Sequence, residues 1–385
     1  MNRILQFCWQ GIVALLWDSA GQIPSVLTDS YDALLSTTLR NYQPKLRDNI
    51  TRGNRLVSWL KAKGRTRKVD GGERVQVPLM HAQNNTADIY SGYGVLDTTP
   101  QDGITSAFYE WAQLSVSITI ARKEKRQNSG KHKALDLLES KTMQSEVSLK
   151  ELLNNCLVAG RITSGASSAS GQFSARVGRL DSGASGPLPL AVLIDVTNSR
   201  NVAVGNINPN TYTFWRNQAK SSTATTFAGL KLEMNGAYND CSKGAGGNPD
   251  LIIADQVGWE EYWGSLQLNE RYIIDDKRTI DILGGSDALK FRGAVMIWDE
   301  VVPDPETNAE VVSAVGTMTV STMYFINSEA WDYIVDSQTD MITTPFLRPE
   351  NQDASVAQIL HMCCTGVNNR RKNGVLYGIS RSIVS

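Results

Sequence analysis

The sequence predicts an α+β fold from two β-patterned segments, one long helix and a second half that mixes helices and strands. The β-patterned segments are 73–81 and 105–121, where apolar and polar side chains alternate with the period of two typical of half-exposed strands. The long helix is expected at 131–160, where apolar residues recur near a spacing of 3.5. A buried strand at 250–255 that leads directly into a helix completes the mixed pattern.

The first 65 residues are expected to form an N-terminal segment followed by a basic helical arm. Residues 4–17 are apolar, but they are too few to span a bilayer, and no Ala-x-Ala cleavage site follows them. Residues 29–63 have the pattern of two helical pieces broken near Pro44. The N-terminal segment therefore indicates a packing or removable piece, with secretion as the less favoured interpretation.

Charge is uneven along the chain, although the net charge is only −1. Ten lysines and arginines and one acid lie between Arg40 and Lys68, and acids outnumber bases by ten to five between Asn269 and Glu310. Such runs are either solvated surface or complementary patches between subunits, which fix register more than they add affinity. Contact with nucleic acid is a weaker interpretation, because few aromatic residues are interleaved with the basic run. The candidate inter-subunit contact residues are Arg52, Arg55, Lys61, Lys63, Arg65, Tyr90, Tyr93, Arg122, Lys123 and Lys125.

Residues 66–125 are expected to form an extended β-hairpin with a polar tip that carries Tyr90 and Tyr93. An isolated two-stranded hairpin is marginally stable in water. A long structureless loop inside a compact domain is also unusual unless the loop works by contact. Both difficulties disappear if the hairpin lies on a neighbouring copy of the same chain. The hairpin therefore predicts an assembly subunit.

The remaining elements follow in order along the chain. After the long helix, residues 163–187 are rich in Gly, Ser and Ala and predict a flexible loop. The later segments are predicted as a buried strand at 188–196, helices at 227–238 and after 255, strands at 289–298, 318–326, 356–365 and 375–379, and a polar turn at 368–374.

No catalytic, cofactor or metal site is predicted. The segment 361–364 (His-Met-Cys-Cys) contains soft ligands, but metal sites need about four ligands at characteristic spacing. Strand alternation would place Cys363 and Cys364 on opposite faces, so core packing is the better interpretation. The segment 129–132 (Ser-Gly-Lys-His) lacks the first glycine and the Ser/Thr of a phosphate loop. Five irregularly spaced cysteines indicate reduced thiols rather than a disulfide framework.

The order of these pieces resembles the major capsid protein of tailed bacteriophages, which has the Hong Kong 97-like fold. The stretches that resemble this family are 204–207 (Val-Gly-Asn-Ile), 212–217 (Tyr-Thr-Phe-Trp-Arg-Asn), 248–255 and the turn 370–374. The resemblance covers about residues 29–380, and its weight lies in the order of the elements. Fold analogy alone would be a weak basis for function, and the unsupported hairpin is the independent reason to expect assembly.

The resemblance implies a division of the chain and a set of partners. The implied parts are 1–65, N-terminal segment and basic arm; 66–125, extended hairpin loop; 126–199, peripheral domain with spine helix and flexible loop; 200–345, axial domain; and 346–385, closing strands of the peripheral domain. Hexamers and pentamers of this chain would form an icosahedral shell around double-stranded DNA, with non-specific DNA contacts. Scaffolding, portal and cement proteins are further expected partners. The expected location is the virion, after assembly in the host cytoplasm, with no membrane and no cofactor.

The resemblance also has a chemical consequence. The founding member of the family joins its subunits through a lysine on the extended loop bonded to an asparagine of a neighbour. This chain has no lysine between Lys68 and Lys123, so a shell without such covalent cross-links is expected.

Three alternatives remain. An encapsulin shell would share the fold but enclose protein cargo, an α+β enzyme would need a site that the sequence does not reveal, and a secreted adhesin would need a working signal peptide.

Overall fold

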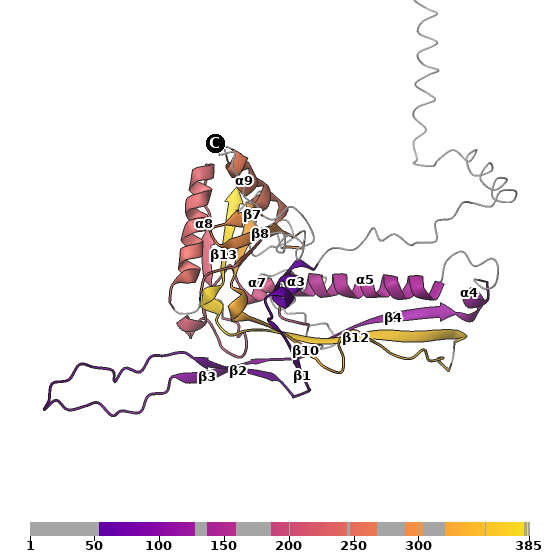
Figure 1. Ribbon diagram of the computed structural model, residues 1–385, viewed down its shortest axis with the longest axis horizontal. Coiled ribbons are helices and arrows are strands. Elements are labelled where there is room, and N and C mark those ends of the chain that lie inside the picture. Colours follow the sequence, from indigo (N-terminus) through magenta and orange to yellow (C-terminus); the bar gives the residue numbers. More distant parts are fainter. Residues whose placement is uncertain are drawn as a thin grey trace, which may run out of the picture. The chain divides into compact units, whose positions relative to one another are not determined.

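The computed structural model describes residues 54–127, 137–158, 186–199, 201–244, 247–267, 289–299, 301–302, 320–350, 352–380 and 383. These residues belong to one compact unit, which contains a five-stranded sheet, a six-stranded sheet and a separate two-stranded hairpin (Figure 1). The mixture of helices and strands confirms the predicted α+β class.

The five-stranded sheet joins strands that are far apart in the sequence. Its strand order is β1 (Thr66–Val69), β10 (Trp331–Asp336), β12 (Ala354–Val367) and β11 (Ile342–Thr343), and β4 (Ala112–Ala121) also pairs with β12. The antiparallel pairing of β4 with β12 runs from Ala121 opposite Ala354 to Ala112 opposite Cys363. The predicted strand at 356–365 is therefore confirmed as the long central strand of this sheet.

Helix α3 (Arg55–Ala62) leads into this sheet. The side chain of Asn54 caps the helix by accepting a hydrogen bond from the Val57 backbone N–H at 3.1 Å, which satisfies one of the free donors of the first turn. The apolar residues Leu56, Trp59 and Leu60 are buried, and the basic residue Lys61 is exposed. The part of the predicted arm before residue 54 lies outside the described residues.

The prediction that 105–121 forms one strand of the hairpin is wrong. The segment 105–121 divides after Tyr109 into β3 (Ile104–Tyr109) and β4, and only β3 pairs with β2 (Val75–Met80). The apolar face of β4 instead packs against the long helix α5 (Leu137–Val158) of the same chain. A period of two identifies a strand, but it does not identify the partner of that strand.

Helix α5 confirms the predicted long helix over its described residues, while 131–136 and 159–160 lie outside them. Its buried residues all lie from Leu149 onward, and Leu138 is 43% exposed. The apolar stripe of this helix is therefore buried only in its C-terminal half.

The six-stranded sheet has the order β5 (Gln218–Ser221), β13 (Gly374–Ser380), β9 (Val320–Ile326), β6 (Leu251–Ala254), β8 (Ala294–Trp298) and β7 (Leu289–Phe291). Helices α8 (Phe227–Ser242) and α9 (Gln256–Gln267) pack against it and confirm the predicted helices. All four residues of β6 are buried, as expected for a central strand covered on both faces. The predicted strand 289–298 is instead a pair, β7 and β8, because Arg292 at φ 55° and Gly293 form a turn.

Residues 188–196 do not form the predicted strand. They contain a short buried helix, α7 (Leu190–Leu193), which begins after Pro189. A short, continuous apolar run has no periodicity that separates a buried strand from a buried helix. Residues 163–185 of the predicted flexible loop lie outside the described residues.

The predicted polar turn between β12 and β13 is largely buried. It contains the short 3₁₀ helix η4 (Arg370–Lys372), and Arg370 is only 1% exposed. The Arg370 guanidinium donates to the backbone carbonyls of Leu193 at 2.9 Å and of Trp215 and Val192 at 3.2 Å. Burial lowers the pKa of Arg370 to about 10, so the side chain remains charged at neutral pH. This turn connects the two sheets, because β12 lies in one and β13 in the other.

Strand pairing crosses the residue ranges suggested for the domains. Strand β10, within 200–345, pairs with β12, and β13, within 346–385, pairs with β5 and β9. The division into five parts stays a prediction.

Candidate assembly interface

The β2–β3 hairpin is anchored at its base to the rest of the unit. Tyr109, at the end of β3, is 1% exposed and donates its hydroxyl to the Val367 carbonyl at 2.7 Å. The Phe108 N–H donates to the Gly205 carbonyl at 3.1 Å. Gly205 has φ +62°, and a Cβ there would lie 3.1 Å from the Ala107 Cβ. This glycine therefore permits the close approach that holds the base of the hairpin.

Beyond this base the hairpin pairs with no other described strand, although Leu79 of β2 is buried in one cluster with Ile207 and Trp215, and the centre of the His81 ring lies 5.1 Å from that of Phe214. Strands β2 and β3 pair only with each other, from Val75 opposite Tyr109 to Met80 opposite Ile104. The residues between them, 81–103, form the tip loop, which extends away from both sheets (Figure 1). Such an extension gains little stability from its own chain.

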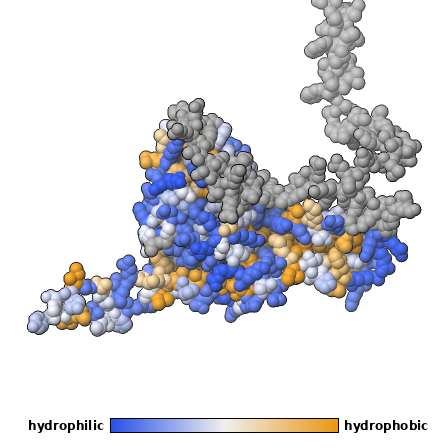
Figure 2. Space-filling model, viewed as in Figure 1, coloured by the Kyte–Doolittle hydropathy of each residue, from blue (hydrophilic) through white to orange (hydrophobic). Residues whose placement is uncertain are grey.

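The tip loop and the strand ends beside it expose an unusual number of large apolar side chains. Ile89 is 97% exposed and Tyr93 is fully exposed, and the apolar colour at this end of the molecule is visible in Figure 2. The exposed large apolar residues here are Met80, Ile89, Tyr90, Tyr93, Val95, Leu96 and Ile104. Clusters of this kind on soluble proteins usually mark contact surfaces. The two predicted contact residues of the loop, Tyr90 and Tyr93, are thus placed where a neighbour could reach them.

Short-range hydrogen bonds shape the tip loop. The Asn84 side chain accepts from the Thr86 N–H at 2.9 Å, and the Asp97 carboxylate accepts from the Thr99 N–H at 2.9 Å and the Thr99 hydroxyl at 2.6 Å. The hydrogen bonds from Thr99 lower the pKa of Asp97, so this carboxylate stays ionised in mild acid. The loop therefore presents an ordered negative charge beside its apolar residues.

Two of the basic candidates in the arm make contacts within the chain. The Arg55 guanidinium donates to the Trp298 carbonyl and lies 5.1 Å from the centre of the Trp298 ring. The Lys63 ammonium lies 3.4 Å from an oxygen of Asp250 and 4.7 Å from the centre of the Trp59 ring. Lys61 is exposed and Arg65 is half-buried, while Arg52 lies outside the described residues.

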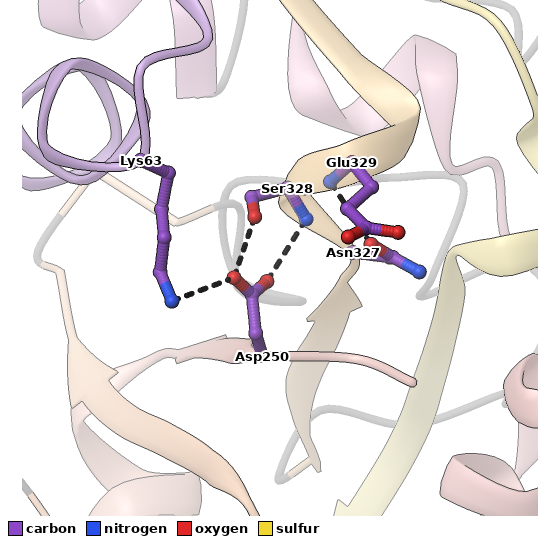
Figure 3. A network of polar contacts seen from close by, with 5 residues as sticks. All are labelled: Lys63, Asp250, Asn327, Ser328 and Glu329. Atoms are coloured by element: carbon purple, nitrogen blue, oxygen red, sulfur yellow. Dashed lines mark hydrogen bonds and ion pairs between the residues drawn. The ribbon is translucent and has the colours of Figure 1, made fainter. Parts of the chain in front are cut away.

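Figure 3 shows the network around Asp250. One oxygen of this carboxylate accepts from the Ser328 N–H at 2.9 Å, and the other accepts from the Ser328 hydroxyl at 2.5 Å and faces Lys63. Beside it, the Asn327 side chain accepts from the Glu329 N–H at 2.9 Å. Because Lys63 follows α3 and Asp250 precedes β6, this network connects the arm to the six-stranded sheet. Lys63 therefore has a structural role that its sequence context did not reveal.

The second basic cluster lies on α4 (Arg122–Gln127), which has no buried residue. Arg122 pairs with Asp353 at 3.2 Å, and Glu124 pairs with Lys141 at 2.8 Å. The hydrogen bond and charge of Lys141 lower the pKa of Glu124. Lys123 and Lys125 are exposed and form no hydrogen bond or ion pair with another residue in the described part of the chain.

The His-Met-Cys-Cys segment is part of the core, as predicted. His361 is 3% exposed, its Nε2 lies 2.8 Å from the Tyr333 hydroxyl, and its Nδ1 lies 3.6 Å from an Asp340 oxygen. Cys363 and Cys364 are buried in different clusters, and burial raises the pKa of both thiols to about 12. Among the residues that the structure describes, no group of side chains could hold a metal ion, and no helix is long and apolar enough to cross a bilayer.

Comparison with known proteins finds no matching family model and no matching curated relative. Solved structures do match, at low identity. A chain of the Cyanophage A-1(L) capsid asymmetric unit has a TM-score of 0.61 and 14% identity, over 89% of this chain and 97% of that one. The SrpI encapsulin of Synechococcus elongatus PCC 7942 has a TM-score of 0.52 and 12% identity, over 92% and 97%. The capsid of Myoviridae phage XM1 has a TM-score of 0.51 and 9% identity, over 94% and 100%.

These matches define the class of fold. The chain has the fold of subunits found in phage capsids and in an encapsulin. This is the Hong Kong 97-like fold that the sequence predicts, with its extended hairpin and long helix.

Proposed function

We propose that this chain is a structural protein, the major capsid subunit of a tailed bacteriophage. Copies of it assemble into an icosahedral shell that encloses double-stranded DNA. The fold supports this proposal, and the tip loop is the observation that carries it. An exposed, apolar loop at the end of a hairpin whose strands pair only with each other is stable and soluble when a neighbouring copy covers it.

Hexamers and pentamers are the assemblies that this proposal requires. Scaffolding, portal and cement proteins are further partners in the proposal, and DNA contacts are non-specific. The chain acts without catalysis, within the virion, after assembly in the host cytoplasm.

An encapsulin-like nanocompartment is the second candidate, because a solved encapsulin shares the fold over most of the chain. The contents of the particle separate the two functions. A capsid holds DNA that nuclease cannot reach, whereas a nanocompartment holds a second protein in a fixed ratio to the shell. Nuclease protection and mass spectrometry of particles from the natural source distinguish these outcomes.

The test of assembly is negative-stain electron microscopy and sedimentation of the overexpressed chain, alone and with the structural proteins encoded beside it. We expect rings or closed shells. Replacing Ile89, Tyr93 and Val95 together with serine should abolish them while leaving circular dichroism unchanged, since these side chains touch no core. The control variant, Ile89→Leu with Tyr93→Phe and Val95→Ile, keeps the apolar character and should assemble. A chain that stays monomeric under all these conditions would refute the proposal.

A further inference from the structure

A hollow lies on the six-stranded sheet side of the molecule, between α8, α9 and β7. Its volume is about 480 Å³, and ligand pockets usually measure roughly 300–1,000 Å³. Its floor is Phe291, a buried residue whose ring packs edge-on against Tyr238 and Tyr262, with ring centres 6.1 and 5.9 Å away. The Tyr262 hydroxyl donates to the Lys290 carbonyl at 3.0 Å. The aromatic floor of the hollow is therefore held in place by contacts within the chain.

The wall of the hollow that α8 forms is apolar and open to solvent. Leu232 lines the hollow and is 72% exposed, and Leu266 of α9 lines it from the other side. Helix α8 already packs its opposite face, with Leu230 and Met234, into the core of this sheet. An exposed apolar hollow on an element that is otherwise buried is typical of a contact surface for another molecule.

Arg292 lies at the rim of the hollow in a strained backbone conformation. Its φ of 55° is in the left-handed region, and it occupies the first position of the two-residue turn between β7 and β8, where Asn, Asp or Gly is usual. Its guanidinium donates to the amide oxygens of Asn235 and Asn239, both at 2.6 Å, and lies 4.5 Å from the centre of the Tyr238 ring. A strained residue whose side chain is fixed in this way indicates a role for the side chain rather than for the turn.

The carboxylates of α8 and α9 do not balance the positive charge of the hollow. Lys231, its second cation, uses one N–H group on the Ser265 carbonyl at 2.9 Å. The four acids of these helices are engaged elsewhere: Glu233 accepts from the Thr223 N–H at 3.0 Å, Asp240 pairs with Lys243 at 2.6 Å, Glu260 accepts from the Gln256 amide at 2.8 Å, and Glu261 accepts from the Ile383 N–H. An anion that binds both Lys231 and Arg292 must therefore come from outside these two helices.

We infer that this hollow binds a segment of a second protein in which large apolar side chains are flanked by carboxylates. The apolar side chains pack on Phe291 and Leu232, and the carboxylates pair with Lys231 and Arg292. Because the hollow is open on the side of Leu232, it fits a peptide segment better than a small molecule, which needs to bury most of its surface.

The site is formed before its partner arrives. The aromatic floor and the guanidinium of Arg292 are held by contacts within the chain, so little order is lost on binding. The inference goes beyond the proposed function, since it needs no contact between copies of this chain.

Fluorescence anisotropy with the full-length chain tests the inference. The probe is a fluorescein-labelled peptide in which leucines form one face of a helix and glutamates flank them. A second peptide has lysine in place of each glutamate, and a third has serine in place of each leucine. We expect the first peptide to bind at least about tenfold more tightly than either of the others, because only it supplies both the apolar and the anionic groups.

Charge exchange locates the binding site. The variant Lys231→Glu with Arg292→Glu should lose at least about tenfold in affinity for the glutamate peptide and should bind the lysine peptide instead. Lys150→Glu, at an exposed lysine of α5 outside the hollow, is the matched control and should bind like the native chain. Arg292→Gly removes the guanidinium while suiting the φ of 55°, so it should fold and still bind weakly. The melting temperature of each variant establishes that it folds.

Three results would overturn the inference. The first is equal binding of the glutamate peptide and either of the other two peptides. The second is native affinity in both hollow variants. The third concerns a second copy as the occupant: Leu232→Cys would then react with maleimide more slowly as the concentration of the chain rises without peptide, whereas a hollow that serves another protein stays reactive. A chain that binds the peptide but forms no rings or shells would contradict the proposed function alone.

Discussion

Two lysines near the end of α3 differ in their surroundings, although their sequence context is the same. Lys63 faces Asp250 at 3.4 Å in a partly buried site, whereas Lys61 is exposed. We expect Lys63→Glu to lower the free energy of unfolding by about 1 kcal/mol, because it places a carboxylate beside Asp250. Lys61→Glu should change this free energy by less than about 0.5 kcal/mol. Urea denaturation of both variants measures the difference, and equal effects would contradict it.

His361 gives the folded chain a dependence on pH. Burial lowers its pKa below the usual 6.5, and Lys61 acts in the same direction, while Asp340 opposes both. The unfolded chain therefore binds a proton in a range where the folded chain does not, so stability is full above about pH 6.5 and is lost as pH falls toward the lower folded value. We expect the loss in unfolding free energy between pH 7.5 and 5.5 to be smaller in His361→Gln. Parallel denaturation curves at the two pH values check this, and an unchanged loss would contradict it.

At the scale of residues, the sequence predicts local patterns better than long-range partners. Alternation was enough to place Cys363 and Cys364 on opposite faces of a strand. The burial of Arg370 could not be predicted, because the carbonyls that receive its guanidinium belong to Val192, Leu193 and Trp215, far away in the sequence. The same limit applies to Lys63, whose partner Asp250 lies just before β6, far away in the sequence.

The anchoring of the hairpin depends on Gly205. A side chain at this position would meet both unfavourable backbone geometry, at φ +62°, and the Tyr109 ring at 3.2 Å. We expect Gly205→Ala to lower the free energy of unfolding by about 2–4 kcal/mol.

Gly64→Ala is the matched control for this prediction. Gly64 has φ +68°, but no atom lies within 4 Å of the position of a Cβ. Gly64→Ala should therefore lower the free energy of unfolding by only about 1–2 kcal/mol, which is the cost of the backbone strain alone. Thermal or urea unfolding of the two variants separates strain from crowding, and an equal loss in both would show that the Tyr109 contact is unimportant.

At the scale of elements, the sequence predicts strands and helices more reliably than their pairing. The β patterning of 105–121 is correct for β3 and β4, but the break after Tyr109 sends β4 to β12 rather than to β2. The contact surface was predicted from the lack of support for a hairpin. Strands β2 and β3 do pair only with each other, although Leu79 of β2 packs in a core cluster, whereas α5 and β12 support β4. The acidic residues of the tip loop can be read from the sequence, but the structure is needed to show that the apolar residues beside them, such as Ile89, are exposed.

For the whole molecule, the sequence predicts shells without covalent links between subunits. In the described structure, Lys68 lies in β1 and pairs with Asp340 at 2.9 Å, and Lys123 lies on α4, so neither ammonium is on the tip loop. We expect particles boiled in detergent to release a single band at the monomer mass, because the contacts between copies are non-covalent. A ladder of multimers that survives this treatment would contradict the prediction.

The order in which the strands are made sets when the six-stranded sheet can close. Strand β13 is the last strand of the six-stranded sheet to be synthesised, yet it lies inside the sheet between β5 and β9. Until residue 380 has left the ribosome, β5 cannot join the sheet, and one edge of β9 stays unpaired. The six-stranded sheet can therefore close only after β13 has been synthesised, so its folding is late relative to the synthesis of its other five strands.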